Sequence, residues 1–360
     1  MAKLFLTVEE NAAEIEKIIS SISMEDIKEM DTIVVHSGTF HADDVTFVSL
    51  ILEARYEMGI TTIPKIIRAP RNDLKKIIEE IDSDGSKYIV GDIGGGTFDH
   101  HDMLVVRNLS NIHGGDFISE KRAEIPYAAA GKLWLAIGKD LVGSERFARE
   151  ADEKFFIPLD LNDNLGSIEM VQDRRCNNGL IYTTNIPNSF SMSISWLNGD
   201  PTNDLEQYAA FMKAVEFVRL QLRGMIKMYK NATESYIENK VEELENENKD
   251  KGYVVLDKYI PSYLFNFKKI KFVVEPATNP GWWQIAAVNS NEMSIINREN
   301  ISSMAPEIGA KLDAYDKRVD SGEIKTQKIF FHKTGFLACF PEKEMAIKVA
   351  MLSILNKAIN

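Results

Sequence analysis

The stretch TIVVHSGTFHADD, residues 32–44, decides how the fold of this chain is interpreted. It joins a β-branched apolar run, typical of a buried strand, to a polar segment and then to the start of a helix. The same alternation continues downstream and predicts a doubly wound α/β fold, a parallel sheet covered by helices on both faces. The expected elements are strands at residues 32–35, 63–67 and 88–90 and helices at residues 43–58 and 73–81.

Length and composition favour a globular protein of two domains. The chain has 360 residues, which is long for one hydrophobic core. Its hydrophobic fraction of 44% and charged fraction of 27% are ordinary for a soluble protein. The net charge of −12 argues against a duplex-DNA binder that works by bulk positive charge. It leaves a nucleic-acid enzyme open, because bound metal ions can reverse the sign inside a site.

Cysteine usage and the N-terminus favour a cytoplasmic protein. Cys176 and Cys339 form neither a disulfide framework nor a Cys-x-x-Cys motif, so two reduced thiols are expected. No apolar run approaches the roughly 20 residues of a membrane span. The first ten residues turn acidic and lack the patterns of signal and transit peptides. We therefore expect no membrane partner.

The pattern along the chain divides it into four segments. A polar helical segment with apolar positions on one face comes first, and the alternating strands and helices follow it. A stretch with near-3.6 apolar spacing then predicts one long helix or two in series, and it ends in a charged run that stops at Gly252. Strand-like runs and a last helix predict a smaller α+β domain. The expected boundaries are an N-terminal helical extension at 1–30, a metal-binding catalytic domain at 31–203, a linking helix at 204–252 and the α+β domain at 253–360.

Histidines and aspartates gather just after the apolar runs. Only six histidines occur in 360 residues, and four of them lie in these patches. Ligands of parallel α/β sheets bind beyond the carboxyl ends of the strands. His36 follows Val35 and Asp92 closely follows Val90, so both stand where such a site is expected. Imidazole and carboxylate are ligands of hard or borderline divalent metals, and the pattern predicts a two-metal hydrolase.

The spacing of the ligand types suggests how two ions are shared. His41 and Asp43 point to one side of an extended loop, and His36 completes that set. Asp92 comes from a neighbouring strand and can bridge two ions, while His100 and either Asp160 or Asp163 close the second. Two such ions activate water and clamp the attacking and leaving oxygens of a phosphoryl group. Each residue alone has another explanation, since Asp43 can cap a helix and Asp160 can form a turn.

Two further features near these patches are less specific. Residues 94–96 are all glycine, which favours a tight turn that brings Asp99, His100 and His101 back toward the site. Arg174 and Arg175 are candidates for phosphate contacts, although surface arginines are the commoner explanation.

The residues quoted so far resemble the DHH phosphoesterase superfamily and, within it, the melanocyte proliferating gene (Myg-type) family. The most specific stretch is HSGTFHADD at 36–44. The similarity extends over roughly residues 32–350. Further matching stretches are FDHH at 98–101, IPYAAAGKLW at 125–134, Asp160 with Asp163 and Asn164, WWQIAAV at 282–288 and FHKTGF at 331–336.

The resemblance implies a manganese-type dinuclear centre, with Mg²⁺ and Co²⁺ as alternatives, and a second domain that closes over the site. It implies His36, His41 and Asp92 as ligands of one metal and His101 near the substrate phosphate. For the other metal it implies Asp43, Asp92, His100 and Asp160. It also implies phosphoester hydrolysis, since relatives include 3′-to-5′ RNA exonucleases, oligonucleotide phosphodiesterases and inorganic pyrophosphatases. Mitochondrial or nuclear pools are known in the family.

Two departures from the family pattern affect these assignments. Leu165 follows Asn164 where the family has glycine, so the choice between Asp160 and Asp163 stays open. The acidic doublet ends in Asp44 where glutamate is common, and Asp44 is not assigned as a ligand.

A C-terminal loop resembles the substrate-gripping loop of the superfamily's second domain. It comprises His332, Lys333 and Gly335, and a simple strand-end turn is the alternative.

The predicted function is a metal-dependent phosphoesterase that hydrolyses single-stranded RNA or short oligonucleotides from the 3′ end. One alternative is a phosphohydrolase of a small compound such as pyrophosphate or a dinucleotide. Another is a metal-binding interaction protein without activity. The sequence leaves the oligomeric state open, with a homo-oligomer among the choices.

Overall fold

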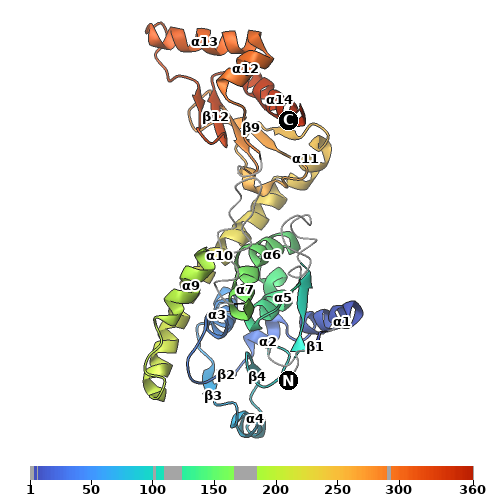
Figure 1. Ribbon diagram of the computed structural model, residues 1–360, viewed down its shortest axis with the longest axis vertical. Coiled ribbons are helices and arrows are strands. Elements are labelled where there is room, and N and C mark those ends of the chain that lie inside the picture. Colours follow the sequence, from blue (N-terminus) through green and yellow to red (C-terminus); the bar gives the residue numbers. More distant parts are fainter. Residues whose placement is uncertain are drawn as a thin grey trace. The chain divides into compact units, whose positions relative to one another are not determined.

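The computed structural model describes residues 4–5, 7–99, 103–108, 124–165, 185–289 and 293–359. The chain forms two compact units, Met1–Thr233 and Glu234–Asn360. The division falls inside the long helix α10, Asp204–Glu238 (Figure 1).

A three-stranded parallel sheet forms the base of the first unit. Its strands are β2 (Thr32–His36), β3 (Lys65–Ala69) and β4 (Tyr88–Val90), and their order is β3-β2-β4. In the register, Val34 of β2 stands beside Ile67 of β3 and Val90 of β4. This confirms a mixed α/β unit with parallel strands where the sequence predicted them.

Helices pack on the two faces of this sheet. Strand alternation turns Val34 toward α4 (Leu74–Ser83), and they share an apolar cluster with Ile81 and Ile93. The neighbouring residues of β2 face α3 (Ala42–Glu57), which runs across the other side (Figure 1). A Cβ added to Gly91 would lie 2.4 Å from the ring of Phe47, so glycine is needed for this close approach. The larger doubly wound arrangement stays a prediction.

Helix α3 is the centre of the first unit, and its residues from Ala42 to Arg55 are all buried. It contacts α5, α7 and α9 as well as the sheet. The remaining helices are α1 (Val8–Ile19), α2 (Met24–Lys28), α5 (Ala129–Val142), α6 (Glu145–Ala151), the π-helical turn η3 (Asp152–Phe156), α7 (Ile157–Leu165) and α9 (Asn185–Ser195).

The residues before β2 are tied into this unit. Strand β1 (Leu4–Phe5) pairs in parallel with β5 (Met103–Leu104), and the antiparallel pair β6 (Val106–Asn108) and β7 (Glu124–Pro126) lies next in the chain. The guanidinium of Arg55 in α3 donates to the carbonyl oxygens of Ile27, Lys28 and Met30 at the end of α2. The segment expected as an N-terminal extension therefore packs against α3.

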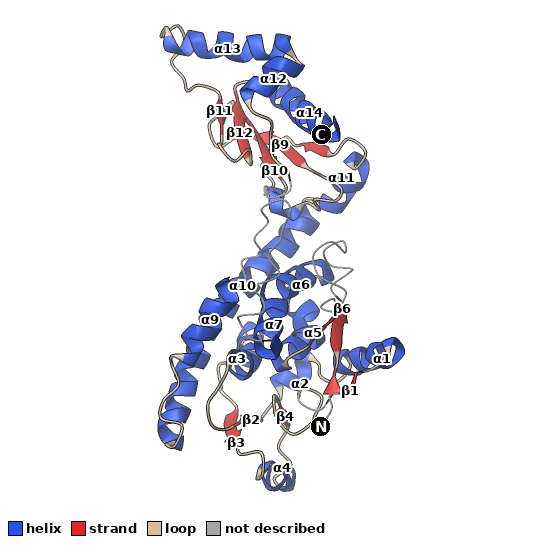
Figure 2. Ribbon diagram, viewed as in Figure 1, coloured by secondary structure: helices blue, strands red, loops and turns tan. Residues whose placement is uncertain are grey.

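The second unit contains a five-stranded sheet together with several helices (Figure 2). Its strand order is β11-β12-β10-β9-β8, antiparallel except for the β8–β9 pair. Its buried core includes Phe272, Ile285, Leu312 and Phe340. The elements are α11 (Val241–Asn248), β8 (Tyr253–Val255), the 3₁₀ turn η4 (Ser262–Leu264), β9 (Phe272–Pro276), β10 (Trp283–Ala287), α12 (Arg298–Met304), α13 (Pro306–Asp320), β11 (Phe330–Phe331), β12 (Leu337–Phe340) and α14 (Lys343–Ile359).

Two features here refine the sequence interpretation. The stretch expected as one long helix or two forms α10 and α11, separated at Lys240, whose φ is 50°. Across the described residues, no helix combines the length and apolar character required to cross a membrane.

A buried carboxylate joins α3 to α10. Glu53 is fully buried and accepts from Arg219 at 2.7 Å and from Arg223 at 2.8 and 2.9 Å. We expect Glu53→Gln to destabilise the protein by about 3 kcal/mol, because Arg223 loses its counter-charge and Arg219 keeps only the exposed Glu216. Unfolding in guanidinium chloride measures this loss of unfolding free energy, provided that the m-value is unchanged.

The matched control is Glu57→Gln on the same helix. Glu57 pairs with Lys230 in a more exposed position, so its loss is expected to cost less than about 1 kcal/mol. Equal shifts for the two variants would contradict the special role of Glu53.

Candidate metal centre

The loop between β2 and α3 supplies the first candidate ligands. His36 ends β2, and Gly38 takes a left-handed conformation with φ 83° before the chain enters α3 at His41. The backbone N–H of His41 donates to Oδ1 of Asp44 at 2.8 Å, which closes the first turn of the helix. Acidic side chains are favoured there, because the free N–H groups of a helix N-terminus carry partial positive charge.

Asp92 is placed by an unusual backbone conformation directly after β4 and Gly91. Its φ is 56°, a region that residues other than glycine seldom adopt. Its N–H donates to the carbonyl oxygen of Phe98 at 3.0 Å, and Gly91 forms a parallel bridge with Phe98. The loop between them includes Gly94 and Gly95, both with positive φ. The tight turn expected from the three glycines is therefore present, and it fixes the position of the Asp92 carboxylate.

His36, Asp44 and Asp92 come together as one potential metal-binding group. Nε2 of His36 lies 3.3 Å from Oδ2 of Asp44 and 3.3 Å from Oδ2 of Asp92. One ligand atom from each residue lies within 4.8 Å of the other two. Nδ1 of His36 is 2.9 Å from the carbonyl oxygen of Ser37, so a proton on Nδ1 leaves the Nε2 lone pair directed at the carboxylates.

Burial makes this group electrostatically demanding. Burial and the neighbouring charge of Asp92 raise the pKa of Asp44 to about 6, against the opposing effect of His36. Burial lowers the pKa of His36, but the hydrogen bond to Asp92 and the charge of Asp44 outweigh it and raise that pKa to about 9. The two carboxylates therefore require a positive charge nearby, which a protonated imidazole or a bound cation can supply.

A divalent cation fits this donor set. Oδ2 of Asp44 is buried, and among the described residues it has no hydrogen-bond partner. One imidazole nitrogen and two carboxylate oxygens are suitable ligands for Mn²⁺ and other borderline or hard divalent ions. A bound cation would replace the Nε2 proton of the imidazolium, and Nε2 of His36 and the Oδ2 atoms of Asp44 and Asp92 would be its ligands.

Two other predicted ligands cap helix α5. Oδ1 and Oδ2 of Asp43 accept from Ala130 and Ala129 at 2.8 and 2.9 Å, and Oδ1 of Asp160 accepts from Ala128 at 3.1 Å. Both carboxylates are buried and satisfy the free N–H groups of this helix. They connect α3 and α7 to α5.

A buried lysine lies in the first turn of α5. Nζ of Lys132 donates to the carbonyl oxygen of Asp99 at 2.6 Å. Burial lowers the pKa of Lys132 to about 8, against the opposing charges of Asp99, Asp43 and Asp160. Oδ2 of Asp99 itself accepts from the backbone N–H of Gly95 at 2.5 Å. This second cluster contains three predicted site aspartates around one ammonium group.

The structure describes some of the remaining predicted site residues of the first unit and not others. His41 is exposed, with its ring centroid 5.6 Å from that of His36. Asp163 is half-buried in α7, one turn beyond Asp160. His100, His101, Arg174 and Arg175 lie outside the described residues.

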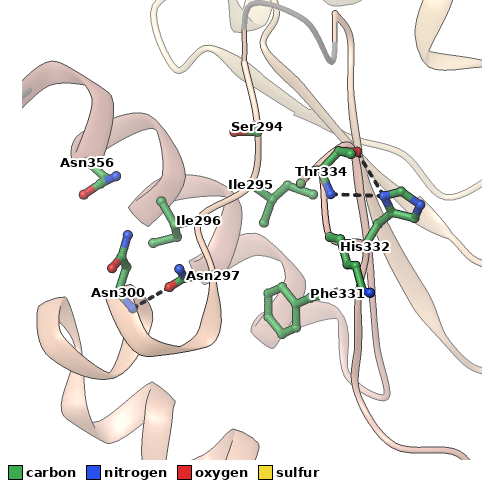
Figure 3. Close-up of a pocket in the computed structure, with 11 residues that line it drawn as sticks. Ser294, Ile295, Ile296, Asn297, Asn300, Phe331, His332, Thr334 and Asn356 are labelled. Carbon is green, nitrogen blue, oxygen red and sulfur yellow. Dashed lines mark hydrogen bonds between the residues drawn. The ribbon is translucent and has the colours of Figure 1, made fainter.

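The predicted substrate loop lines a pocket of about 440 Å³ in the second unit (Figure 3). The N–H of Thr334 donates to Nδ1 of His332 at 3.3 Å, and Lys333 is exposed beside it. Gly335 has φ 72°, and a Cβ there would lie 2.8 Å from the carbonyl oxygen of Ile295. The other polar lining residues are Ser294, Asn297, Asn300 and Asn356.

The residue that the sequence analysis missed is Asp44. As the third residue of α3 it closes a helix cap, and that role alone explains an acidic side chain there. Only the three-dimensional position of Asp92, set by its left-handed backbone, shows that the other oxygen of Asp44 faces a second carboxylate.

Comparison with known proteins identifies the family. Residues 32–354 match the family model MYG1_exonuc, which is described as an uncharacterised protein family, UPF0160. The match covers well over half of the chain, so the protein belongs to this family. No curated protein and no solved structure shows a significant match.

Metal affinity at this group is expected to depend on pH. The proton on His36, with a pKa of about 9, must leave before Nε2 binds a metal, so apparent affinity falls about tenfold for each pH unit below 9. Protonation of Asp44 steepens the loss below pH 6. Calorimetric titration with manganese in two buffers of different ionisation enthalpy measures the released proton. Binding at pH 7 without proton release would contradict this assignment.

Substitution separates Asp44 from Asp43. In Asp44→Asn the side-chain oxygen still accepts from His41, but the charge is lost, so we expect manganese affinity to fall by at least about tenfold. Asp43→Asn tests the ligand that the family resemblance implies. The exposed Asp84 provides the control Asp84→Asn, which should bind metal as the parent protein does. Unchanged manganese binding in Asp44→Asn would remove Asp44 from the centre.

Proposed function

We propose that this protein is a metal-dependent phosphoesterase that hydrolyses the phosphodiester bonds of RNA or short oligonucleotides from the 3′ end. The observation that carries the proposal is the group of His36, Asp44 and Asp92: His36 and Asp92 stand at the carboxyl ends of two parallel strands, and Asp44 is buried in the first turn of α3. Membership of a family whose model is named for an exonuclease supports the reaction class.

The proposal assigns His36, Asp44 and Asp92 to one cation, with His41 beside them. Asp43, Asp160 and His100 are the candidates for a second ion, as the DHH-type resemblance suggests. Divalent ions bound there, Mn²⁺ being the expected metal, would lower the pKa of water and withdraw charge from the phosphoryl oxygens. Helix caps position the carboxylates of Asp43, Asp44 and Asp160, and the turn at Asp92 positions the fourth, so little reorganisation of them is needed during reaction.

The pocket of the second unit, taken by itself, has polar groups that suit a nucleotide or phosphate ligand. Lys333 and His332 offer donors for phosphate oxygens. Asn297 and Asn300 offer both donors and acceptors, which suits base edges and sugar hydroxyls.

The net charge of −12 provides little long-range attraction for long RNA and favours the second candidate, hydrolysis of a small phosphate compound such as pyrophosphate or a dinucleotide.

Incubation with manganese and 5′-labelled single-stranded RNA tests the reaction. We expect a ladder of products shortened from the 3′ end, and loss of cleavage by at least about 10³-fold in Asp92→Ala, because that carboxylate holds the cation. Turnover of a dinucleotide and of a twenty-residue RNA, compared at equal concentration, separates the two substrate classes.

Magnesium and cobalt are tested in parallel. Absence of cleavage with all three metals, for the RNA, the dinucleotide and pyrophosphate alike, would reject a phosphoesterase.

A further inference from the structure

A cation without an acidic partner stands beside the candidate metal centre. Arg68 lies on β3 at the position that pairs with Val35, one residue before the partner of His36. Strand alternation directs its side chain to the α3 face of the sheet. Its charge acts on Asp44 of the metal-binding group and on Asp204 at the start of α10.

The guanidinium is held by a carbonyl oxygen and two aromatic rings. Nη2 donates to the carbonyl oxygen of Gly38 at 2.6 Å, in the loop that joins His36 to His41. The guanidinium carbon lies 5.5 Å from the ring centre of Phe40 and 4.7 Å from that of Phe211. Aromatic faces attract a cation without cancelling its charge, as a carboxylate would.

No acidic side chain of the described residues therefore neutralises the positive charge of Arg68. Within the described parts of the chain Arg68 forms no ion pair, and its buried Nε has no hydrogen-bond acceptor. Burial lowers the pKa of Arg68, yet an arginine stays protonated at all physiological pH values. A half-buried guanidinium with unused donors is costly unless another group pairs with it.

Contacts other than those of Arg68 also hold this loop. Asn198 holds the backbone of Phe40 with two hydrogen bonds, one to the N–H and one to the carbonyl oxygen, each of 3.0 Å. Phe40 is fully buried and packs edge-on against Phe211. The loop therefore has anchors besides Arg68, and we expect it to keep its shape when the guanidinium binds a ligand.

We propose that Arg68 binds an anionic oxygen of the substrate phosphate next to the metal-binding group. This rests on the proposed phosphoesterase function and adds a substrate-binding residue to it. The planar guanidinium matches the geometry of phosphate oxygens, and the aromatic rings hold its plane fixed before the ligand arrives. The cation also offsets the repulsion that Asp44 and Asp92 exert on an incoming anion.

Inorganic phosphate is the probe for this assignment. Its binding to the full-length, manganese-loaded protein is measured by calorimetry for the parent and for Arg68→Gln, Arg68→Lys and Arg71→Gln. We expect Arg68→Gln to weaken phosphate binding at least tenfold. Arg68→Lys should lose less phosphate affinity, about three- to tenfold, because lysine keeps the positive charge but lacks the paired N–H donors of the guanidinium. Arg71, exposed just beyond the same strand, should change binding less than twofold.

Manganese binding by the same variants separates ligand binding from loop positioning. Manganese affinity within threefold of the parent in Arg68→Gln, together with weak phosphate binding, supports the proposal. Equal losses of manganese and phosphate binding would overturn it, because Arg68 would then act only by positioning the ligands.

Phosphate binding that is unchanged in Arg68→Gln, or absent in the parent protein, would overturn it as well. Each of these results is obtained without turnover. A protein that binds phosphate through Arg68 but cleaves no substrate would leave this inference standing and reject the phosphoesterase function.

Discussion

The burial of two carboxylates around one imidazole is the constraint on which the first unit depends. Asp44 and Asp92 are almost completely removed from water, and each adds to the cost of ionising the other. Such a pair is tolerated only beside a cation. His36 can supply this charge as an imidazolium, and a divalent metal would supply more charge while binding an oxygen of each carboxylate. A group that needs a positive charge in order to stay buried is a natural metal site.

The surrounding elements are joined by similar polar contacts. The N-terminus of α5 receives carboxylates from α3 and α7, and the buried Lys132 adds a fixed charge one turn further on. Asp43 thus has a structural role that the sequence analysis considered only as an alternative to metal binding. The two roles are compatible, because a carboxylate has more lone pairs than the two N–H groups use.

Much of this arrangement could be predicted from sequence because it follows local rules. The parallel strands follow from apolar runs, and the site position follows from the strand ends. The second unit was harder: strand β12 and helices α12 and α13 had no sequence prediction. In α13 only Ile308, Gly309 and Leu312 are buried, so its apolar pattern is too short to stand out. The role proposed for Arg68 could not be predicted from the sequence either, because the rings of Phe40 and Phe211 that contact its guanidinium are distant from it along the chain.

The structure explains the aspartate at position 92 in a way that the sequence pattern does not. Glycine adopts a left-handed backbone conformation at the lowest energetic cost, and Gly94 and Gly95 in the same loop do so. An aspartate there carries a backbone cost of about 1–3 kcal/mol, and the hydrogen bond to Phe98 helps to hold it. That cost brings no gain in packing, because Gly91 already makes the close contact with α3. It does bring the carboxylate within 3.3 Å of His36, which is the position that the proposed metal site requires.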